Sequence, residues 1–314
     1  MLADLIFSLN IVIPVFLMIL LGYVLKRIDI ITPGYLTSGN KIVFYICLPA
    51  LLFRGVYTAD IGEFFDIRLI SFALGASVVS VLAAWLIAVA FIKDKPMLGA
   101  FTQGSFRGSL TLVGLPVMLN LAGYLGMARY AIVITFVIPF LNVLSIVALT
   151  PCSGEKVSVK TTLIAIVKNP SNIAIIFGVM LGVLGLRLPA IAEEAAFSVA
   201  NMAAPFALIC MGGSMTFQKF DERFKFAVIG SFVKVVAVPL LFVVGGYLFG
   251  FRDFDLAVLV VMGGAPSAVV GFAMASQMGG DTYVAGMIVV ISTLMSAVTL
   301  TLFIFALRTM GLLA

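Results

Sequence analysis

The chain contains 314 residues, of which 63% are hydrophobic and only 11% are charged, and its formal net charge is +5. A soluble domain of this size cannot bury so much apolar surface, so the composition predicts an all-α membrane protein that crosses the bilayer many times. Because the apolar runs are long and continuous rather than alternating, a membrane β-barrel is excluded. The positive balance then indicates basic cytoplasmic loops and no nucleic-acid partner.

Apolar runs separated by charged or turn residues predict ten spans in chain order. Their approximate ranges are 5–25, 38–57, 67–92, 98–122, 128–150, 162–186, 190–213, 225–249, 254–278 and 282–307. The first run lacks a basic leader and a small-residue cleavage site, so we interpret it as a span rather than a signal peptide. Eleven Lys and Arg residues fall in one set of alternate loops and six in the other, which predicts that both termini lie outside.

The residue types that the sequence lacks narrow the function. There is no histidine, and the three cysteines form no close pair, so we expect neither a metal site nor a cofactor. An enzyme would need histidine or carboxylate groups clustered at membrane depth, and the apolar runs contain none, so we expect no catalytic residues. No G-x-x-x-x-G-K-S/T loop is present, which argues against ATP as the direct source of energy.

The stretch 263–281, GGAPSAVVGFAMASQMGGD, interrupts an apolar run near its middle. Pro266 removes a backbone donor there, and the neighbouring glycines weaken the helix. In hydrocarbon, unpaired backbone groups persist only where they are buried in protein or line a wet cavity. The stretch is therefore either a simple kink or one side of a ligand site.

A shift of about 157 residues, half of the chain, carries Gly108-Ser109 onto Ala265-Pro266. This correspondence predicts two repeats, residues 1–157 and 158–314, joined by the polar segment 151–160. With five spans in each half, the repeats must be inserted in opposite orientations. Inverted repeats with two matching interrupted helices are found in secondary transporters, in which the substrate binds between the interruptions.

Several motifs resemble those of the auxin efflux carrier family, whose bacterial members transport organic anions. FRGSLTLVGLPVMLNLAGYLG at residues 106–126 is similar to the family's fourth helix, and APSAVVGFAMASQMGGD is similar to its ninth. Lys234 with Pro239, Pro49 and Asn142 also fit the family. The resemblance implies a crossed-helix fold in which spans 1, 2, 6 and 7 form a scaffold and spans 3–5 and 8–10 form a mobile core. It also implies the bacterial inner membrane and suggests a homodimer formed through the scaffold.

Two charges lie inside predicted spans or interruptions. All fourteen acidic residues fall at span ends or in loops, so no intramembrane carboxylate is available as a proton relay or sodium ligand. We hypothesise that the Lys234 ammonium lies beside the helix crossing and favours an anion; the alternative is that it snorkels to the cytoplasmic interface. Arg107 either attracts a substrate carboxylate or pairs with a loop carboxylate or backbone carbonyls.

Half-helices that start after Gly108 and Pro266 would direct free N–H groups towards the crossing. We predict a substrate site and a set of break or hinge positions. The site comprises Arg107, Gly108, Ser109, Thr111, Asn142, Lys234, Ala265, Pro266, Ser267 and Gln277, and the hinge positions are Gly114, Pro116, Gly264 and Gly271. Ser109 stands where the family often has asparagine, which bears on substrate choice. Asn142 could instead join two helices, and Asn40 is expected to cap one.

We expect a secondary carrier that moves a small organic anion by alternating access at the crossing of the fourth and ninth helices. The anion is expected to be a mono- or dicarboxylate, malonate- or malate-like or auxin-like. The alternative is a sodium- or proton-coupled ion exchanger of the same fold. A channel would not need an inverted repeat with two interruptions.

Overall fold

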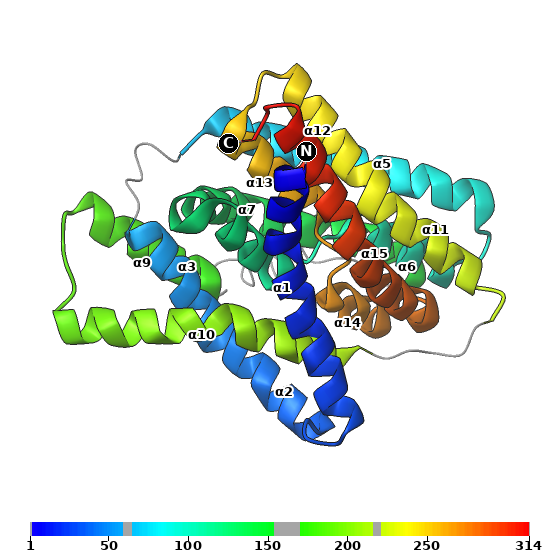
Figure 1. Ribbon diagram of the computed structural model, residues 1–314. Helices are drawn as coiled ribbons and strands as arrows, with labels where there is room; N and C mark the ends of the chain where they lie inside the picture. Colours follow the sequence, from blue (N-terminus) through cyan, green and yellow to red (C-terminus); the bar gives the residue numbers. More distant parts are fainter. Residues whose placement is uncertain (1, 59–64, 154–169, 216–220, 314) are drawn as a thin grey trace.

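The structure is a computed structural model, and it describes residues 2–58, 65–153, 170–215 and 221–313. Within these ranges the chain is helical, with one isolated backbone bridge and no strand (Figure 1). Seven helices in the described part are long and apolar enough to cross a membrane. The chain is therefore a multi-pass helical membrane protein, as its composition predicts. The count of ten spans in two inverted repeats remains a prediction.

The described residues form α-helices and short π-helical turns, the latter labelled η. In chain order they are α1 Leu2–Arg27, α2 Pro33–Ile42, η1 Val43–Cys47, α3 Leu48–Tyr57, α5 Ile67–Phe91, α6 Lys95–Phe106, η2 Leu110–Gly114, α7 Leu115–Ser153, α9 Pro170–Val183, α10 Ala190–Ser214, α11 Phe224–Phe232, η3 Val233–Ala237, α12 Val238–Leu248, α13 Asp253–Gly264, α14 Val269–Gln277 and α15 Thr282–Thr309.

Three short π-helical turns occur at prolines. Each turn ends just before a residue–proline pair that contains Pro49, Pro116 or Pro239. Proline cannot donate a backbone hydrogen bond, and its ring displaces the carbonyl of the preceding turn, so the helix widens there instead of ending. As a result α2, η1 and α3 continue as one rod over residues 33–57, and α11, η3 and α12 continue as another over residues 224–248.

Two helical paths are fully interrupted rather than widened. α6 ends at Phe106 and η2 starts at Leu110, so residues 107–109 form a first break; residues 265–268, between α13 and α14, form a second break. α6 and α13 have 12 residues each, which corresponds to about 18 Å and is too short to cross a hydrocarbon core of about 30 Å. The second break covers four residues, whereas the sequence indicated only the Ala265-Pro266 pair.

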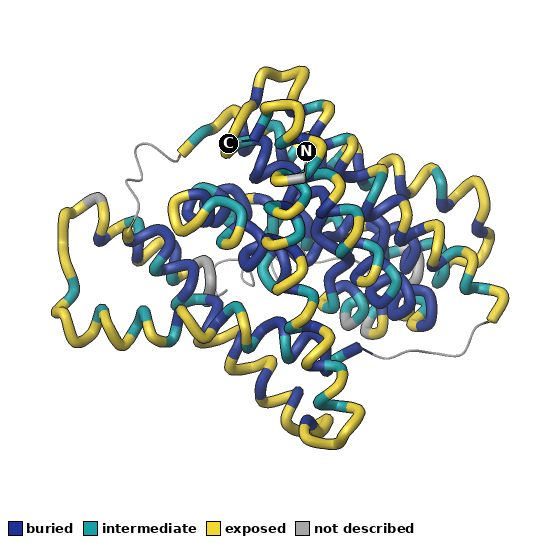
Figure 2. Tube along the Cα trace, in the orientation of Figure 1, coloured by how far each residue is buried: buried dark blue, intermediate teal, exposed yellow. Residues whose placement is uncertain are grey.

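The interrupted helices lie at the centre of the molecule. α13 packs against α7, α12 and α15, and α6 packs against α5, α7 and α15. Figure 2 shows buried residues concentrated there, while exposed residues follow the outer sides of the surrounding helices. α1 lies against α10 and α15, and Asp4 near the start of α1 pairs with Arg308 near the end of α15 at 3.3 Å.

Some sequence predictions need correction. The second predicted span begins at residue 33 rather than 38. Thr32 caps this rod by accepting a hydrogen bond from the Tyr35 N–H at 3.2 Å. Asn40 lies inside this rod, so the prediction that it caps a helix is wrong. The expected boundary at residues 123–127 has a counterpart in the structure: Gly123 has a φ of +63° and a ψ of −163°, which are not helical angles, so α7 consists of two helical segments that meet at a kink there. Most of the predicted linker 151–160 and the repeat boundary lie outside the described residues.

Candidate functional site

The two breaks pair with each other through their backbones. Ser109 N–H donates to Pro266 O at 2.7 Å, and Ala268 N–H donates to Arg107 O at 3.1 Å, which forms an antiparallel bridge between Gly108 and Ser267. Buried backbone donors and acceptors must find partners, and in a membrane they cannot rely on water. Each break supplies partners for the other. The interruption at 263–281 is therefore more than a kink, because it meets the interruption near Gly108.

A cavity of about 410 Å³ lies beside the paired breaks. Its wall comes from the rod 33–57, the first break with η2, the middle of α7, one residue of α9, and the start of α14. The lining residues are Asn40, Val43, Phe44, Leu48, Leu52, Arg107, Gly108, Ser109, Leu110, Thr111, Leu112, Ile134, Thr135, Ile138, Leu141, Asn142, Ile175, Ala268, Val269 and Val270. Five of the ten predicted site residues are among them: Arg107, Gly108, Ser109, Thr111 and Asn142.

The first turns of two half-helices line this cavity. Residues 110–112 open η2 and residues 269–270 open α14. The first backbone N–H groups of a helix have no partner within that helix, and they carry the positive end of its dipole. Helix N-termini of this kind bind anions without any charged side chain. Both breaks thus present positive potential to the same space.

Among the described residues that line the cavity, only Arg107 is charged. Its side chain is 7% exposed, and its guanidinium donates to Asn142 Oδ1 at 2.6 Å and to Ser145 Oγ at 2.9 Å. No carboxylate pairs with it among the described residues. The expected alternative, a structural ion pair with a loop carboxylate, is therefore absent in the part of the chain that the structure describes. Asn142 accepts a hydrogen bond from Arg107 and also lines the cavity. Its position is therefore compatible with both roles considered for it, joining two helices and contributing to the site.

The opposite wall is largely apolar. Val43, Phe44, Leu48 and Leu52 lie on one face of the rod 33–57, and Asn40 continues that face at one end. Asn40 Nδ2 lies 3.4 Å from Ser214 Oγ of α10. Sequence reasoning missed Asn40 as a wall residue, although its spacing of three, four and eight residues from the apolar positions would have placed it on their face.

Lys234 does not snorkel. Its exposed fraction is 0%, and its Nζ donates to the carbonyl oxygen of Gly263 at 2.5 Å. Gly263 is in the last turn of α13, where carbonyl groups lack helical partners and carry the negative end of the dipole. Lys234 lies in the π turn before Pro239, and Gly263 packs so tightly on Pro239 that a Cβ would stand 2.7 Å from its Cα. Lys234 thus donates a hydrogen bond to the helix end that precedes the second break, and it is not among the residues that line the cavity.

The other predicted positions lie around the breaks. Ala265, Pro266 and Ser267 form the second break itself, and Ser267 N–H donates to Ser292 Oγ at 3.0 Å. Gln277 ends α14, and its side chain lies outside what the structure describes. Among the hinge positions, Gly114 packs against the Tyr130 hydroxyl, Gly264 against Leu300, and Gly271 beside the Arg107 side chain, while Pro116 follows the π turn of η2.

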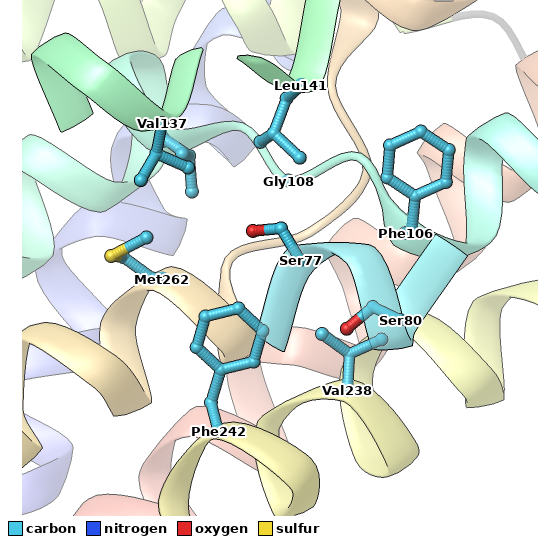
Figure 3. Close-up of a pocket in the computed structure, with 10 residues that line it drawn as sticks. Ser77, Ser80, Phe106, Gly108, Val137, Leu141, Val238, Phe242 and Met262 are labelled. Atoms are coloured by element: carbon cyan, nitrogen blue, oxygen red, sulfur yellow. The ribbon is translucent and has the colours of Figure 1, made fainter. Parts of the chain in front are cut away.

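A second cavity, of only about 10 Å³, lies behind the first break. Figure 3 shows Ser77 and Ser80 of α5 in its wall together with Phe242 of α12 and Met262 of α13. Gly108, Leu110 and Leu141 line both cavities and separate them. The predicted repeat shift of about 157 residues carries Ser77 onto Lys234. The volume of this second cavity is about that of one water molecule.

The sequence is similar to those of known proteins along nearly its whole length. Residues 7–304 match the family described as membrane transport protein. An uncharacterized transporter of Methanothermobacter thermautotrophicus is 23% identical over 94% of this chain and 97% of its own length. The uncharacterized transporter YfdV of Escherichia coli is 24% identical over 96% and 98%, and one from Methanocaldococcus jannaschii is 24% identical over 95% and 97%. Because the family match covers nearly the whole chain, the protein belongs to the membrane transport protein family, the auxin efflux carrier family that its motifs resemble.

Proposed function

We propose that the protein is a secondary carrier that moves a small organic anion through the cavity beside the paired breaks. The observation that carries this proposal is the charge of the cavity wall. Arg107 is buried there, and among the described residues no carboxylate pairs with it and no acidic side chain lines the cavity. Two helix N-termini open onto the same space. A carboxylate bound beside Arg107 would supply the missing negative charge.

The wall favours a monocarboxylate over a dicarboxylate. One guanidinium and both N-termini lie at the side of the breaks, whereas the rod 33–57 contributes aliphatic and aromatic side chains. A second carboxylate would have to lie against these apolar groups without a counter-charge, which is costly. A volume of about 410 Å³ accommodates a small organic molecule. The substrate we propose has one carboxylate and an apolar body.

The mechanism we propose is alternating access between a scaffold and a core. In the ten-span arrangement of two inverted repeats, the rod 33–57 and α9 belong to the scaffold, and the breaks, α7 and α14 belong to the core. The cavity wall draws on both groups, so relative movement of the groups would change access to the anion. Ion exchange is less well supported, because none of the described residues that line the cavity carries a carboxylate for sodium or a proton. Both termini outside, the bacterial inner membrane and a homodimer through the scaffold are parts of this proposal.

Uptake by the purified protein in proteoliposomes tests this function. We expect saturable uptake of labelled apolar monocarboxylates, accelerated when the same anion is preloaded on the opposite side, and at least tenfold slower uptake of dicarboxylates of equal length. The corresponding methyl esters serve as uncharged controls. Uptake that does not saturate, or esters that compete as well as their acids, would exclude an anion carrier. A sodium or proton gradient that drives counter-transport of cations without any anion would support the exchanger instead.

A further inference from the structure

The two ends of the main cavity differ. At one end the wall reaches Asn40 and Phe44, and both residues are exposed. At the other end, about 18 Å along the rod, the wall stops at Leu52, which is buried. Just beyond it, Gly55 packs onto α7 so closely that a Cβ would stand 2.8 Å from Met127 Cε. The wall thus ends in exposed residues at the Asn40 end and in buried, tightly packed residues at the Gly55 end, which we call the closed end.

A cluster centred on Arg54 lies at the closed end. Arg54 Nη1 donates to Asn201 Oδ1 of α10 at 2.5 Å, and the Tyr124 hydroxyl of α7 donates to the same oxygen at 3.2 Å. The Arg54 guanidinium carbon lies 4.1 Å from the centre of the Tyr124 ring and 4.6 Å from that of Phe197. Arg54 therefore joins the rod, α10 and α7 in one cluster.

The contacts of this cluster are of a kind that can form and break. Arg54 has no carboxylate partner among the described residues, and its neighbours are an amide and two aromatic rings at a partly exposed site. Exposed cation–π and amide contacts are weak compared with a buried ion pair. Releasing them exposes no unpaired carboxylate. The closed end is thus held by contacts that a modest rearrangement can reverse.

Tyr124 lies at the kink of α7. It directly follows Gly123, whose φ of +63° turns α7. The same helix carries Asn142 and Ser145, which hold the Arg107 guanidinium in the cavity. α7 therefore connects the side chains that contact the proposed anion with the side chains that close the far end, so a ligand that shifts α7 would act on both.

We propose that Arg54, Tyr124 and Asn201 form a latch that keeps the cavity closed at the Gly55 end and that must open for the anion to exit or enter there. The proposal rests on the carrier function above, since a cavity with one fixed entrance could not deliver its ligand across the membrane. Opening separates Tyr124 from Arg54 and Asn201 and moves Met127 away from Gly55. The Asn40 end would close in the same transition.

Side-specific labelling tests the latch without any knowledge of the substrate. Leu52→Cys in a background with Cys47, Cys152 and Cys210 replaced by serine places one thiol at the closed end of the cavity. A membrane-impermeant maleimide is applied to either face of sealed vesicles. We expect Arg54→Gln to raise labelling from the face nearest Gly55 at least fivefold, Arg54→Lys to raise it less, and Tyr124→Ala to act like Arg54→Gln.

Arg187→Gln is the matched control, because Arg187 stacks on Tyr57 near the same end of the rod, at 5.4 Å, without contacting α7 in any described interaction. Unchanged labelling in Arg54→Gln and Tyr124→Ala, or an equal rise in Arg187→Gln, would overturn the latch. Thermal melting of each purified variant separates release of the latch from loss of the fold. If Arg54→Gln raised labelling and also lowered the melting temperature strongly, while Arg54→Lys did neither, the rise would reflect loss of the fold and would count against the latch.

A cross-link distinguishes failure of the latch from failure of the carrier proposal. Arg54→Cys with Tyr124→Cys, joined by a short reducible bifunctional reagent, should abolish anion uptake, and reduction should restore it. Uptake that persists in the linked protein would overturn the latch and leave the carrier intact. If anion uptake were absent before linking while Arg54→Gln still raised labelling as expected, the carrier function would be overturned and the latch would stand.

Discussion

The two breaks are joined by one backbone bridge but differ in the side chains that surround them. At the second break, the carbonyl end of α13 receives the buried ammonium of Lys234. At the first break, Arg107 turns into the main cavity, and Ser77, which the predicted repeat shift carries onto Lys234, lines the small second cavity. Lys234 donates to the end of a helix, whereas Arg107 donates to two neutral side chains and lines the main cavity. The two breaks thus differ in their charged groups, and we expect the first break to respond to substrate.

Removing the Arg107 charge should have the largest effect on this asymmetry. Arg107→Gln deletes a charge-assisted contact worth about 1.5–3 kcal/mol, so we expect apparent anion affinity to fall about 10- to 100-fold, with Arg107→Lys intermediate. The measurement is concentration-dependent uptake or binding of a labelled monocarboxylate. Arg68→Gln is the control, since Arg68 lies outside the cavity wall. Affinity unchanged in Arg107→Gln would remove the first break from substrate recognition.

Loosening the partners of Arg107 should have a smaller effect. Asn142→Leu leaves the guanidinium without its shorter hydrogen bond, and we expect apparent affinity to fall about tenfold; Ser145→Ala, which loses the longer bond, should cost about threefold. A cycle with Arg107→Gln measures the coupling. If the effects of Asn142→Leu and Arg107→Gln simply add, Asn142 contacts the substrate independently of Arg107.

Neutralising Lys234 should change the transport rate more than the apparent affinity, in contrast to Arg107→Gln. Lys234→Met keeps the length of the side chain but leaves the Gly263 carbonyl without its donor. We expect transport rate to fall by about threefold to tenfold while apparent affinity changes less than threefold, because the ammonium supports the break and does not line the cavity. Lys225→Met, at an exposed position of α11, is the control. A tenfold loss of affinity at unchanged rate would restore the hypothesis that Lys234 acts on the anion.

The smallest effect is expected at Ser77, the counterpart of Lys234. Its hydroxyl donates to Ala73 O at 2.7 Å within its own helix, so Ser77→Ala removes only a local bond and slightly enlarges a cavity of about 10 Å³. We expect uptake to stay within twofold and stability to change by less than about 1 kcal/mol. A large loss of uptake would show that the small cavity takes part in transport and that the two halves are more alike than their charges indicate.

Much of this arrangement follows from local sequence. Pro266 and the glycines around both breaks weaken a helix, so the two interruptions could be predicted from the residues alone. The hydrogen-bond partners of the two buried cations could not be predicted from the sequence. Arg107 meets Ser145, and Lys234 meets Gly263, because of how whole helices pack, and no local pattern encodes those contacts. Asn40 lies on the cavity face because the rod begins at Pro33 and not at the predicted residue 38. From the sequence alone, a polar residue near the end of a predicted span is interpreted as a cap.

The bridge between Gly108 and Ser267 has a consequence for how the chain is made. Ser109 N–H finds its acceptor only in Pro266, which the ribosome adds 157 residues later. Until then, the first half of the nascent chain enters the bilayer with a donor exposed at the middle of an interrupted helix. The bridge can form only after the second break has been synthesised, so the first break reaches its final backbone pairing late in the synthesis of the chain.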